Sequence, residues 1–521
     1  MLPEFRNEPL TDFSRPEYRS AMEEALKKIK SELGQKYPVV VGGEKIFTDD
    51  TFNSINPGRI SEIVGTFSKG DKEMALRAVE TAAIAFETWR FVAPDERARY
   101  LLKAASIIRR RKFEFSAVMV YEVSKSWVEA DADVAETIDF LEFYAREMMR
   151  LGAPQPVISY PGEENELYYI PLGVCAVIPP WNFPFAIMAG MTTAAIVAGN
   201  TVVLKPASTA PFIAWKFFEV MEEVSLPTGV LNFLPGSGGA IGDTIVDHPK
   251  TRLIAFTGSK EIGLRIQERA AKLNPGQIWI KRTILEMGGK DFILVDEDAD
   301  VEAAAEGIVF SAFGFQGQKC SACSRAIIHE KVYDAVLEKI VARTKTLKVG
   351  HPEEYGVTMG AVIDATAQKS IMEYILSGKK DGRCVAGGGS AGVVPTVPAD
   401  GFYVEPTVIA DVPPKAKIAC EEIFGPVLAV IKCQDFDEGV AIANGTEYGL
   451  TGALYSRSRA HLERGRAELH CGNLYLNRKC TGALVGVQPF GGFNMSGTDS
   501  KAGGRDYLLL FTQAKSVTER F

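Results

Sequence analysis

GVCAVIPPWNFPFAIMAGMTTAAIVAGNTVVLKP, residues 173–206, is the stretch that decides the fold. No residue from 170 to 204 is charged, and a hydropathy scan alone would propose a membrane helix of about 20 residues. Adjacent prolines at 179 and 180 and a third at 184 interrupt it, and a helix cannot run through them without losing hydrogen bonds. The stretch therefore predicts a buried strand, a loop, a helix and a second buried strand, which together form the βαβ unit of a parallel sheet.

The alternation of strands and helices continues along the chain. Apolar runs predict strands at GVLNFLPG (229–236), LIAFTGS (253–259), RTILEMGG (282–289), RAIIHE (325–330), FYVEPTVIAD (402–411) and PVLAVIKC (426–433). Helical spacing of apolar residues predicts helices at 15–33, 72–90, 95–122, GAIGDTIVDHP (239–249), KEIGLRIQERAAKL (260–273), VEAAAEGIVFSAF (301–313) and KVYDAVLEKIVARTKTL (331–347). Strands and helices that alternate at this spacing indicate two doubly wound α/β domains.

Composition excludes several classes of protein. The chain has 521 residues, of which 46% are hydrophobic and 24% charged, so it can bury large cores in roughly two or three domains. A net charge of -8 gives no electrostatic reason to expect nucleic acid or an anionic membrane as a partner. Eight cysteines are too dilute for a disulfide scaffold, and the N-terminal MLPEFRNEPLTDF lacks the apolar core of a secretory signal. We therefore expect a cytoplasmic protein with reduced thiols.

Two cysteines in FGFQGQKCSACSR (313–325) have the C-x-x-C spacing of some metal and redox sites. A zinc site needs further ligands, yet the sequence contains no second such pair, and its five histidines are scattered. We therefore predict that the protein has no metal site. GGSAG (388–392) matches the G-x-S-x-G of serine hydrolases, but VVPTVP follows where that motif needs a helix, so it predicts a flexible glycine loop.

Cys320 is either a nucleophile or a small buried residue, since free cysteine is commonly buried. Gly314 and Gly317 break the preceding helix and free the backbone to turn. Lys319 supplies positive charge nearby, and a thiol with an ordinary pKa of about 8.5 needs such surroundings to ionise. These residues alone leave both interpretations open.

Seven motifs make the chain recognisable. In chain order, PPWNFPF (179–185), VVLKPAS (202–208), AFTGS (255–259), ILEMGGKD (284–291), FGFQGQKCSACSR (313–325), EEIFGPVLAV (421–430) and QPFGGFNMSG (488–497) resemble the motifs of the aldehyde dehydrogenase superfamily. The resemblance extends from about residue 40 to the C-terminus. GQIWIKRTILEMGGKD (276–291), the segment 481–511 and the N-terminal helical extension are most similar to one branch, the 1-pyrroline-5-carboxylate dehydrogenases.

The resemblance implies oxidation of an aldehyde to an acid through a covalent intermediate. Cys320 would attack the aldehyde to form a thiohemiacetal, and the Asn182 amide together with the Cys320 N–H would stabilise the oxyanion. After hydride transfer to a nicotinamide, Glu286 would activate the water that hydrolyses the thioester. Without the resemblance, Asn182 would be a loop-capping residue and Glu286 an i,i+4 ion-pair partner of Lys290.

The resemblance also implies a dinucleotide site, with NAD as the cofactor. Lys205 resembles the family lysine that binds the adenosine ribose, although the residue alone is equally consistent with a solvated lysine. Ser208 stands where NAD-selective relatives carry an acid, so we expect NADP to be tolerated. GSGGAIG (236–242) departs from the dinucleotide fingerprint and is weak evidence by itself. The remaining implied cofactor contacts are Ile178, Pro180, Trp181, Gly238, Gly258, Ser259, Glu422 and Phe424.

In the branch that this chain resembles, the substrate is L-glutamate γ-semialdehyde, which derives from 1-pyrroline-5-carboxylate in proline catabolism and is oxidised to L-glutamate. The positions that would bind its carboxylate are Ser321, Gly482 and Ala483, and Phe183 and Phe490 would enclose its aliphatic part. Aromatic residues by themselves more often belong to a core. Two alternatives stay open: a broad-specificity aldehyde dehydrogenase, and a non-catalytic protein that keeps only the fold.

The motifs also imply an order of domains. Residues 1–151 would hold a helical region and the first part of the NAD(P)-binding domain, 152–172 an oligomerisation hairpin, 173–285 the NAD(P)-binding α/β domain, 286–490 the catalytic α/β domain, and 491–521 a C-terminal return and oligomerisation strand. The hairpin and the tail LLLFTQAKSVTERF (508–521) predict strand exchange in a homodimer. The chain is too short to hold a proline dehydrogenase domain as well, so we expect that metabolic neighbour to be a separate polypeptide.

Overall fold

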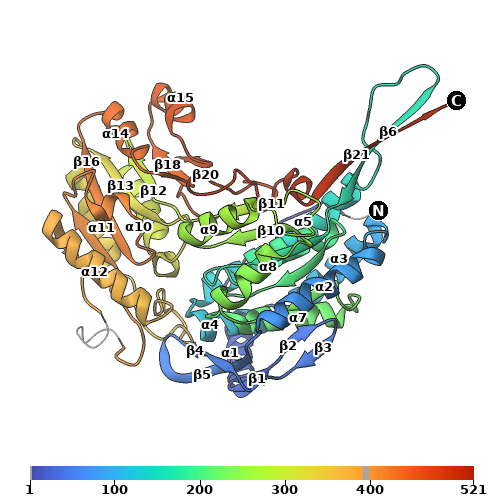
Figure 1. Ribbon diagram of the computed structural model, residues 1–521. Coiled ribbons are helices and arrows are strands. Elements are labelled where there is room, and N and C mark those ends of the chain that lie inside the picture. Colours follow the sequence, from blue (N-terminus) through green and yellow to red (C-terminus); the bar gives the residue numbers. More distant parts are fainter. Residues whose placement is uncertain (1–2, 391–397) are drawn as a thin grey trace.

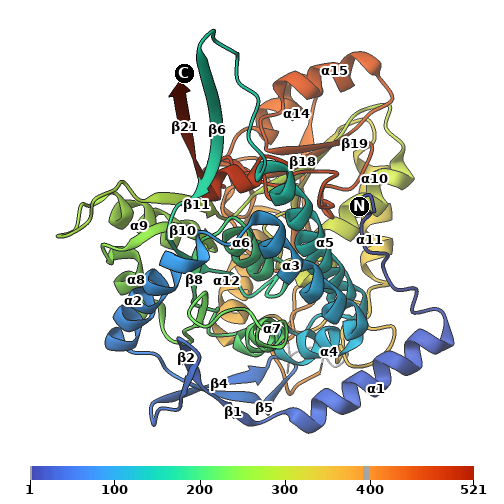
Figure 2. The same cartoon turned by 90° about the vertical axis from the view of Figure 1, so that its right-hand side faces the viewer.

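Two sheets covered by helices and one projecting pair of strands make up the fold (Figures 1 and 2). The structure is a computed structural model that describes residues 3–390 and 398–521. Part of the expected glycine loop at 388–392 lies outside the described residues. Among the helices described, none combines the length and the apolar character needed to cross a membrane.

The first sheet has seven strands in the order β11-β10-β7-β8-β9-β2-β3. Its strands are β2 (Val39–Val41), β3 (Glu44–Ile46), β7 (Val174–Ile178), β8 (Thr201–Leu204), β9 (Leu231–Phe233), β10 (Thr251–Thr257) and β11 (Arg282–Glu286). The predicted βαβ unit is confirmed, because β7 and β8 pair in parallel and α6 (Ala186–Val197) joins them. Val174 and Ala176 pack in one core and Cys175 and Val177 in another, so both faces of the sheet are buried.

The helices of the first half surround this sheet and a small sheet of β1 (Gln35–Tyr37), β5 (Arg59–Ser68) and β4 (Thr51–Asn56). They are α1 (Pro16–Glu32), α2 (Lys72–Trp89), α3 (Pro94–Arg110), α4 (Lys112–Val123), α5 (Trp127–Leu151), α6, α7 (Pro211–Glu223), α8 (Asp243–Asp247) and α9 (Lys260–Ala271). The segment 95–122, expected as one helix, is two helices that meet at Arg111, whose N–H still bonds to the carbonyl of Ile107. Helix α5 packs against α3, α4 and α6 and is therefore the central helix of this half.

The second sheet has seven strands in the order β14-β15-β16-β13-β12-β18-β19. They are β12 (Asp291–Val295), β13 (Cys323–His329), β14 (Arg383–Ala386), β15 (Thr407–Ala410), β16 (Val427–Cys433), β18 (Thr451–Tyr455) and β19 (Asn473–Leu476), with helices α10 (Val301–Phe313), α11 (Tyr333–Thr344), α12 (Ala365–Asp381), α13 (Lys417–Cys420), α14 (Phe436–Ala443) and α15 (Arg459–Glu468). The sequence analysis missed β12, although it is an interior strand. Its residues Phe292 and Leu294 face one core and Ile293 and Val295 the other.

A two-stranded arm projects from the body, formed by β6 (Glu163–Pro171) and β21 (Thr512–Arg520) in antiparallel pairing (Figure 1). The segment 152–172, expected as an oligomerisation hairpin, forms a continuous ladder only with the C-terminal strand. The segment before β6 makes only single bridges to it, at Gln155 and Tyr160, because prolines at 154, 156 and 161 have no N–H to donate. The C-terminal strand supplies the ladder instead. A further short pair joins β17 (Tyr448–Gly449) to β20 (Phe493–Asn494).

Candidate active site

The predicted nucleophile follows a strained turn. Helix α10 ends where expected, and the turn Gly314–Gly317 carries the chain towards Cys320, just before β13. Phe315 (φ 47°) and Gln316 (φ 56°) have left-handed backbones, which cost residues other than glycine about 1–3 kcal/mol each. The buried Gln316 amide donates to the carbonyl of Ala361 at 2.8 Å, so packing and hydrogen bonding hold the turn in this conformation.

The surroundings of Cys320 differ from those expected. Burial raises the pKa of its thiol well above the ordinary value, and nearby carboxylates, Asp291 foremost, raise it further. The expectation that Lys319 would favour the thiolate was wrong, because its Nζ forms an ion pair with Glu129 at 2.7 Å. The protein alone therefore keeps Cys320 as a thiol.

Asn182 lies beside the nucleophile loop. It is 3% exposed, and its Nδ2 donates to the carbonyl of Gln318 at 3.0 Å. The loop-capping alternative is thus wrong, since the acceptor is 136 residues away in sequence. This hydrogen bond places the side-chain amide close to Cys320 and leaves its second hydrogen for another acceptor.

Glu286 ends β11 and faces the segment around β20, which holds Gly492 and Ser500. Its carboxylate accepts the Ser500 hydroxyl at 2.5 Å and the Gly492 N–H at 3.3 Å. Burial raises the pKa of Glu286 to about 8, while these two hydrogen bonds lower it. Among the described residues it forms no ion pair with Lys290, so that alternative is also wrong. Glu286 is also one of the nearby carboxylates that raise the pKa of the Cys320 thiol.

The predicted dinucleotide contacts lie at the carboxyl ends of the strands of the first sheet. Ile178 ends β7, Lys205 follows β8, and Gly258 and Ser259 follow β10. Pro180, Trp181 and Gly238 lie in the connections after β7 and β9. Because β7 is flanked by β8 on one side and β10 on the other, this edge is a topological switch point, where open α/β sheets bind their ligands.

Lys205 is 6% exposed, so the alternative of a solvated lysine is wrong. Burial lowers its pKa to about 8, and its Nζ donates to the carbonyl of Pro206 at 3.2 Å. The Ser208 hydroxyl donates to the carbonyl of Gly236 at 3.3 Å. Ser259 caps α9, whose free N-terminal N–H groups suit a pyrophosphate.

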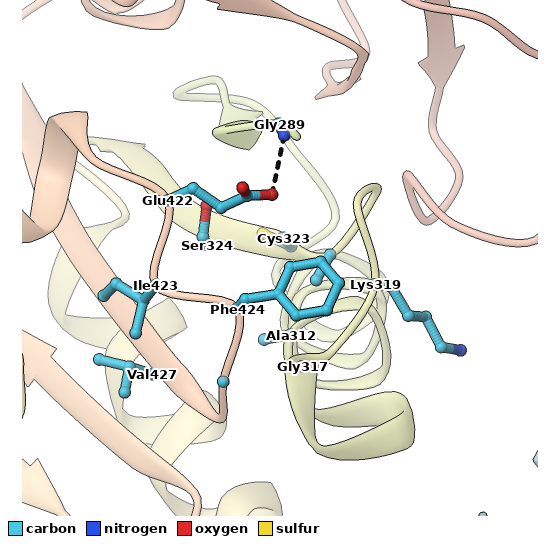
Figure 3. A pocket seen from close by; sticks show the side chains of 12 residues that line it. Gly289, Ala312, Gly317, Lys319, Cys323, Ser324, Glu422, Ile423, Phe424 and Val427 are labelled. Carbon is cyan, nitrogen blue, oxygen red and sulfur yellow. Dashed lines mark hydrogen bonds between the residues drawn. The ribbon is translucent and has the colours of Figure 1, made fainter. Parts of the chain in front are cut away.

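Glu422 and Phe424 border a pocket in the second domain (Figure 3). The Glu422 carboxylate accepts the N–H of Gly289 at 3.0 Å, and burial raises its pKa to about 7. The Phe424 ring stands edge-on to Trp181, with ring centroids 5.5 Å apart. Since Trp181 follows β7 and Phe424 precedes β16, the two sheets meet at these predicted cofactor contacts.

The predicted carboxylate-binding residues also come together. Cys480 donates its thiol to the carbonyl of Ser321 at 3.6 Å, which holds the loop of Gly482 and Ala483 beside the nucleophile loop. Phe490 lies on the segment that holds Glu286, where its N–H bonds to the carbonyl of Ala502 at 2.9 Å.

Comparison with known proteins agrees with this geometry. The profile of the aldehyde dehydrogenase family matches residues 47–517. The chain belongs to the aldehyde dehydrogenase family. The 1-pyrroline-5-carboxylate dehydrogenase of Geobacillus kaustophilus (strain HTA426) is 60% identical to it over 521 residues, with 100% of both chains covered. That of Geobacillus sp. (strain WCH70) is 59% identical over the same span.

Solved structures of this family show the same fold. A Thermus 1-pyrroline-5-carboxylate dehydrogenase with bound NAD has a TM-score of 0.97 and 52% identity, and 100% of both chains is covered. Proline utilization A (PutA) from Bdellovibrio bacteriovorus has a TM-score of 0.97 and 44% identity, but this chain covers only 53% of that one. The α/β fold and the family predicted from the motifs are confirmed.

Sequence reasoning missed a row of charged groups on α5 of this aldehyde dehydrogenase. Lys125 is fully buried, pairs with Asp133 at 2.7 Å, and lies 4.1 Å from the centroid of the Phe183 ring. Glu129, Asp133 and Glu136 follow at helical spacing, and Glu136 has no hydrogen-bond or ion-pair partner in the described part of the chain. Burial raises the pKa of Glu136 to about 8. Acids spaced by three or four residues along α5 were the available signal.

Proposed function

We propose that this protein is a 1-pyrroline-5-carboxylate dehydrogenase, which oxidises L-glutamate γ-semialdehyde to L-glutamate with NAD. The observation that supports the proposal most is that Asn182 donates to the nucleophile loop at Gln318, while Glu286 is one of the carboxylates that raise the pKa of the Cys320 thiol. Identities of 59% and 60% over the full length to proteins of that name support the same substrate.

The first half of the reaction forms a covalent adduct on Cys320. After the thiol proton has passed to a water molecule, the sulfur bonds to the aldehyde carbon, and the carbonyl π electrons move to oxygen. The N–H of Cys320 has no acceptor among the described residues, and the Asn182 amide has a free hydrogen, so both donate to this oxyanion. One such donor typically lowers the barrier by about 3–4 kcal/mol. When the oxyanion collapses, a hydride leaves the carbon and a thioester remains.

The second half releases the acid. Glu286 takes a proton from water while the water oxygen bonds to the thioester carbon, and the C–S bond breaks to return the thiolate and L-glutamate. A pKa of about 8 suits a base that works near neutral pH. Ser500 and Gly492 hold the carboxylate in place and favour its ionised form.

The cofactor site fits NAD. Bound NAD supplies the acceptor for the hydride. Lys205 would bind the adenosine ribose, the start of α9 at Ser259 the pyrophosphate, and Glu422 the nicotinamide ribose. Ser208 carries no charge beside the adenosine ribose, so a 2′-phosphate meets no carboxylate there, and NADP is tolerated to some extent.

The substrate is held at its carboxylate and along its aliphatic chain. Ser321 with the backbone of Gly482 and Ala483 binds the carboxylate, and Phe183 with Phe490 encloses the chain. The semialdehyde derives from 1-pyrroline-5-carboxylate, so proline oxidation is the preceding reaction. We assign residues 173–285 to cofactor binding and 286–490 to catalysis, in line with the two sheets.

A second copy of this chain is the proposed partner. The arm projects from the body (Figure 2), and Ile158 beside it is 93% exposed. A homodimer that pairs across the arms covers this side chain and the free strand edges. Deletion of β21 should therefore give a monomer in light scattering, whereas a dimer of unchanged mass would contradict this assignment. All eight cysteines are free, which supports a reducing, cytoplasmic location.

Initial rates with two aldehydes test the proposed function. We expect kcat/KM for L-glutamate γ-semialdehyde to exceed that for propanal by at least about 100-fold, since a site with buried polar groups rejects substrates that leave them unpaired. NAD should be preferred to NADP, and Cys320→Ala should abolish NAD reduction. Equal turnover of propanal would identify a broad-specificity aldehyde dehydrogenase instead. No turnover of any aldehyde by the wild type would identify a non-catalytic homologue.

A further inference from the structure

One arginine binds three backbone carbonyls of the loop that follows β19. Nη1 of Arg478 donates to the carbonyls of Lys479 at 3.2 Å and Thr481 at 3.3 Å, and Nη2 donates to that of Gly482 at 2.6 Å. The guanidinium also lies over the Tyr475 ring, 4.4 Å from its centroid. Its position is therefore fixed from two sides, and the loop is folded around it.

This arrangement sets the direction of two N–H groups. The described peptide bonds are all trans, and in a planar trans peptide the N–H points opposite to the C=O. Because the carbonyls of Thr481 and Gly482 point at Arg478, the N–H groups of Gly482 and Ala483 point away from it, to the same side. Gly482 has φ 76°, a left-handed backbone that glycine adopts without strain.

Both N–H groups are free to bind a ligand. Within the described residues, neither Gly482 nor Ala483 donates its N–H to any acceptor. The loop lies beside the nucleophile, because the Cys480 thiol bonds to the carbonyl of Ser321 at 3.6 Å. Two parallel N–H donors backed by a guanidinium form a concave site for an anion.

We propose that Arg478 is a positioning residue for the substrate: it aims the N–H groups of Gly482 and Ala483 at the carboxylate of L-glutamate γ-semialdehyde. The inference rests on the proposed function and adds to it the residue that builds the carboxylate site. Arg478 acts through the loop, because its terminal nitrogens donate to three of the loop's backbone carbonyls.

Lysine and methionine at this position separate orientation from charge. Arg478→Lys keeps the charge, but a single ammonium cannot match the planar fork that holds these carbonyls. Arg478→Met removes both charge and fork while keeping a side chain that packs on Tyr475. We expect either variant to raise KM for the semialdehyde at least about 10-fold, since hydrogen bonds to a charged group are lost. The kcat/KM for propanal, which has no carboxylate, should stay within about twofold of the wild type.

Lys479→Met is the matched control. Lys479 is the adjacent cation, and its Nζ lies 3.5 Å from the centroid of the Phe310 ring; in the described structure it donates to no carbonyl of the loop. If the charge alone attracts the carboxylate, Lys479→Met should match Arg478→Met, and Arg478→Lys should behave like the wild type. Either result would overturn the proposal.

A second variant covers the case in which Arg478 is needed for folding. Ala483→Pro deletes one of the two N–H groups and leaves the guanidinium in place. It should raise KM for the semialdehyde by a larger factor than it changes KM for propanal. The proposal is wrong if the semialdehyde and propanal lose kcat/KM equally in these variants, or if neither does. If the wild type itself shows no preference for the semialdehyde, the proposed function fails, and the assignment of Arg478 fails with it.

Discussion

Replacing Ser500 by alanine should slow hydrolysis of the thioester in a pH-dependent way. The Ser500 hydroxyl donates to the Glu286 carboxylate at 2.5 Å, and the pKa of Glu286 is already raised to about 8 by burial. This hydrogen bond favours the ionised form, so its loss raises the pKa further. A hydrogen bond to a charged group contributes about 1.5–3 kcal/mol, and one pKa unit corresponds to about 1.4 kcal/mol. The pKa in Ser500→Ala is therefore expected about 1–2 units higher.

The direction of the effect follows from the role of the base. Only ionised Glu286 accepts a proton, so the rate falls as the pH drops through its pKa. At about pH 7 roughly one tenth of wild-type Glu286 is ionised, and in the variant about a tenth of that or less. The kcat should therefore fall at least about 10-fold at neutral pH and approach the wild-type value in alkaline solution. The initial burst of NADH should persist, because it precedes hydrolysis.

Profiles of kcat against pH, measured with saturating semialdehyde, check this reasoning. Thr498→Val is a matched control, because the Thr498 hydroxyl bonds to the backbone of Leu285 at 3.0 Å and not to Glu286. Its acidic limb should coincide with that of the wild type. The reasoning is refuted if folded Ser500→Ala shows an acidic limb of kcat at the same pH as the wild type or at a lower pH.

Three further substitutions test the rest of the site. Asn182→Ala should slow the NADH burst about 100- to 1000-fold, since an oxyanion donor is lost; an unchanged burst rate would remove this amide from the oxyanion site. Glu136→Gln should raise KM for L-glutamate γ-semialdehyde about 10-fold, because this unpaired carboxylate would meet the ammonium group of the substrate. Glutarate semialdehyde, which lacks the ammonium, should be unaffected, and an equal loss on both would contradict that role. Asp133→Asn should destabilise the protein by about 3–5 kcal/mol, since Lys125 is left as a buried unpaired charge. Urea denaturation measures this change, and an unchanged midpoint would show that the pair does not stabilise the fold.

The sequence was sufficient for the elements whose signal is local. The apolar strands around PPWNFP could be predicted because a strand buried on both faces is a continuous apolar run, and β7 and β8 are such strands. Gly314 and Gly317 marked the end of α10 in the sequence. The approach of Asn182 to the nucleophile loop was expected from the ordered motifs alone.

Features that depend on distant contacts could not be predicted. The partner of β6 is a strand near the other end of the chain, and no local pattern identifies it. The direction of Lys319 was missed because Glu129, on α5, forms an ion pair with it. Ser500 holds Glu286 from 214 residues away, and a serine beyond the QPFGG motif carries no mark of that role. Phe315 and Gln316 adopt left-handed backbones against their own preferences, which only the surrounding packing explains.

The pairing of β6 with β21 also imposes an order in time. Thr518 on β21 bonds to Asn165 on β6 across 353 residues of chain. A ribosome that adds ~5–20 residues per second needs about 20–70 s to make that intervening length. Throughout this interval the edge of β6 that pairs with β21 has no partner, so the nascent chain exposes an edge that favours aggregation until translation ends.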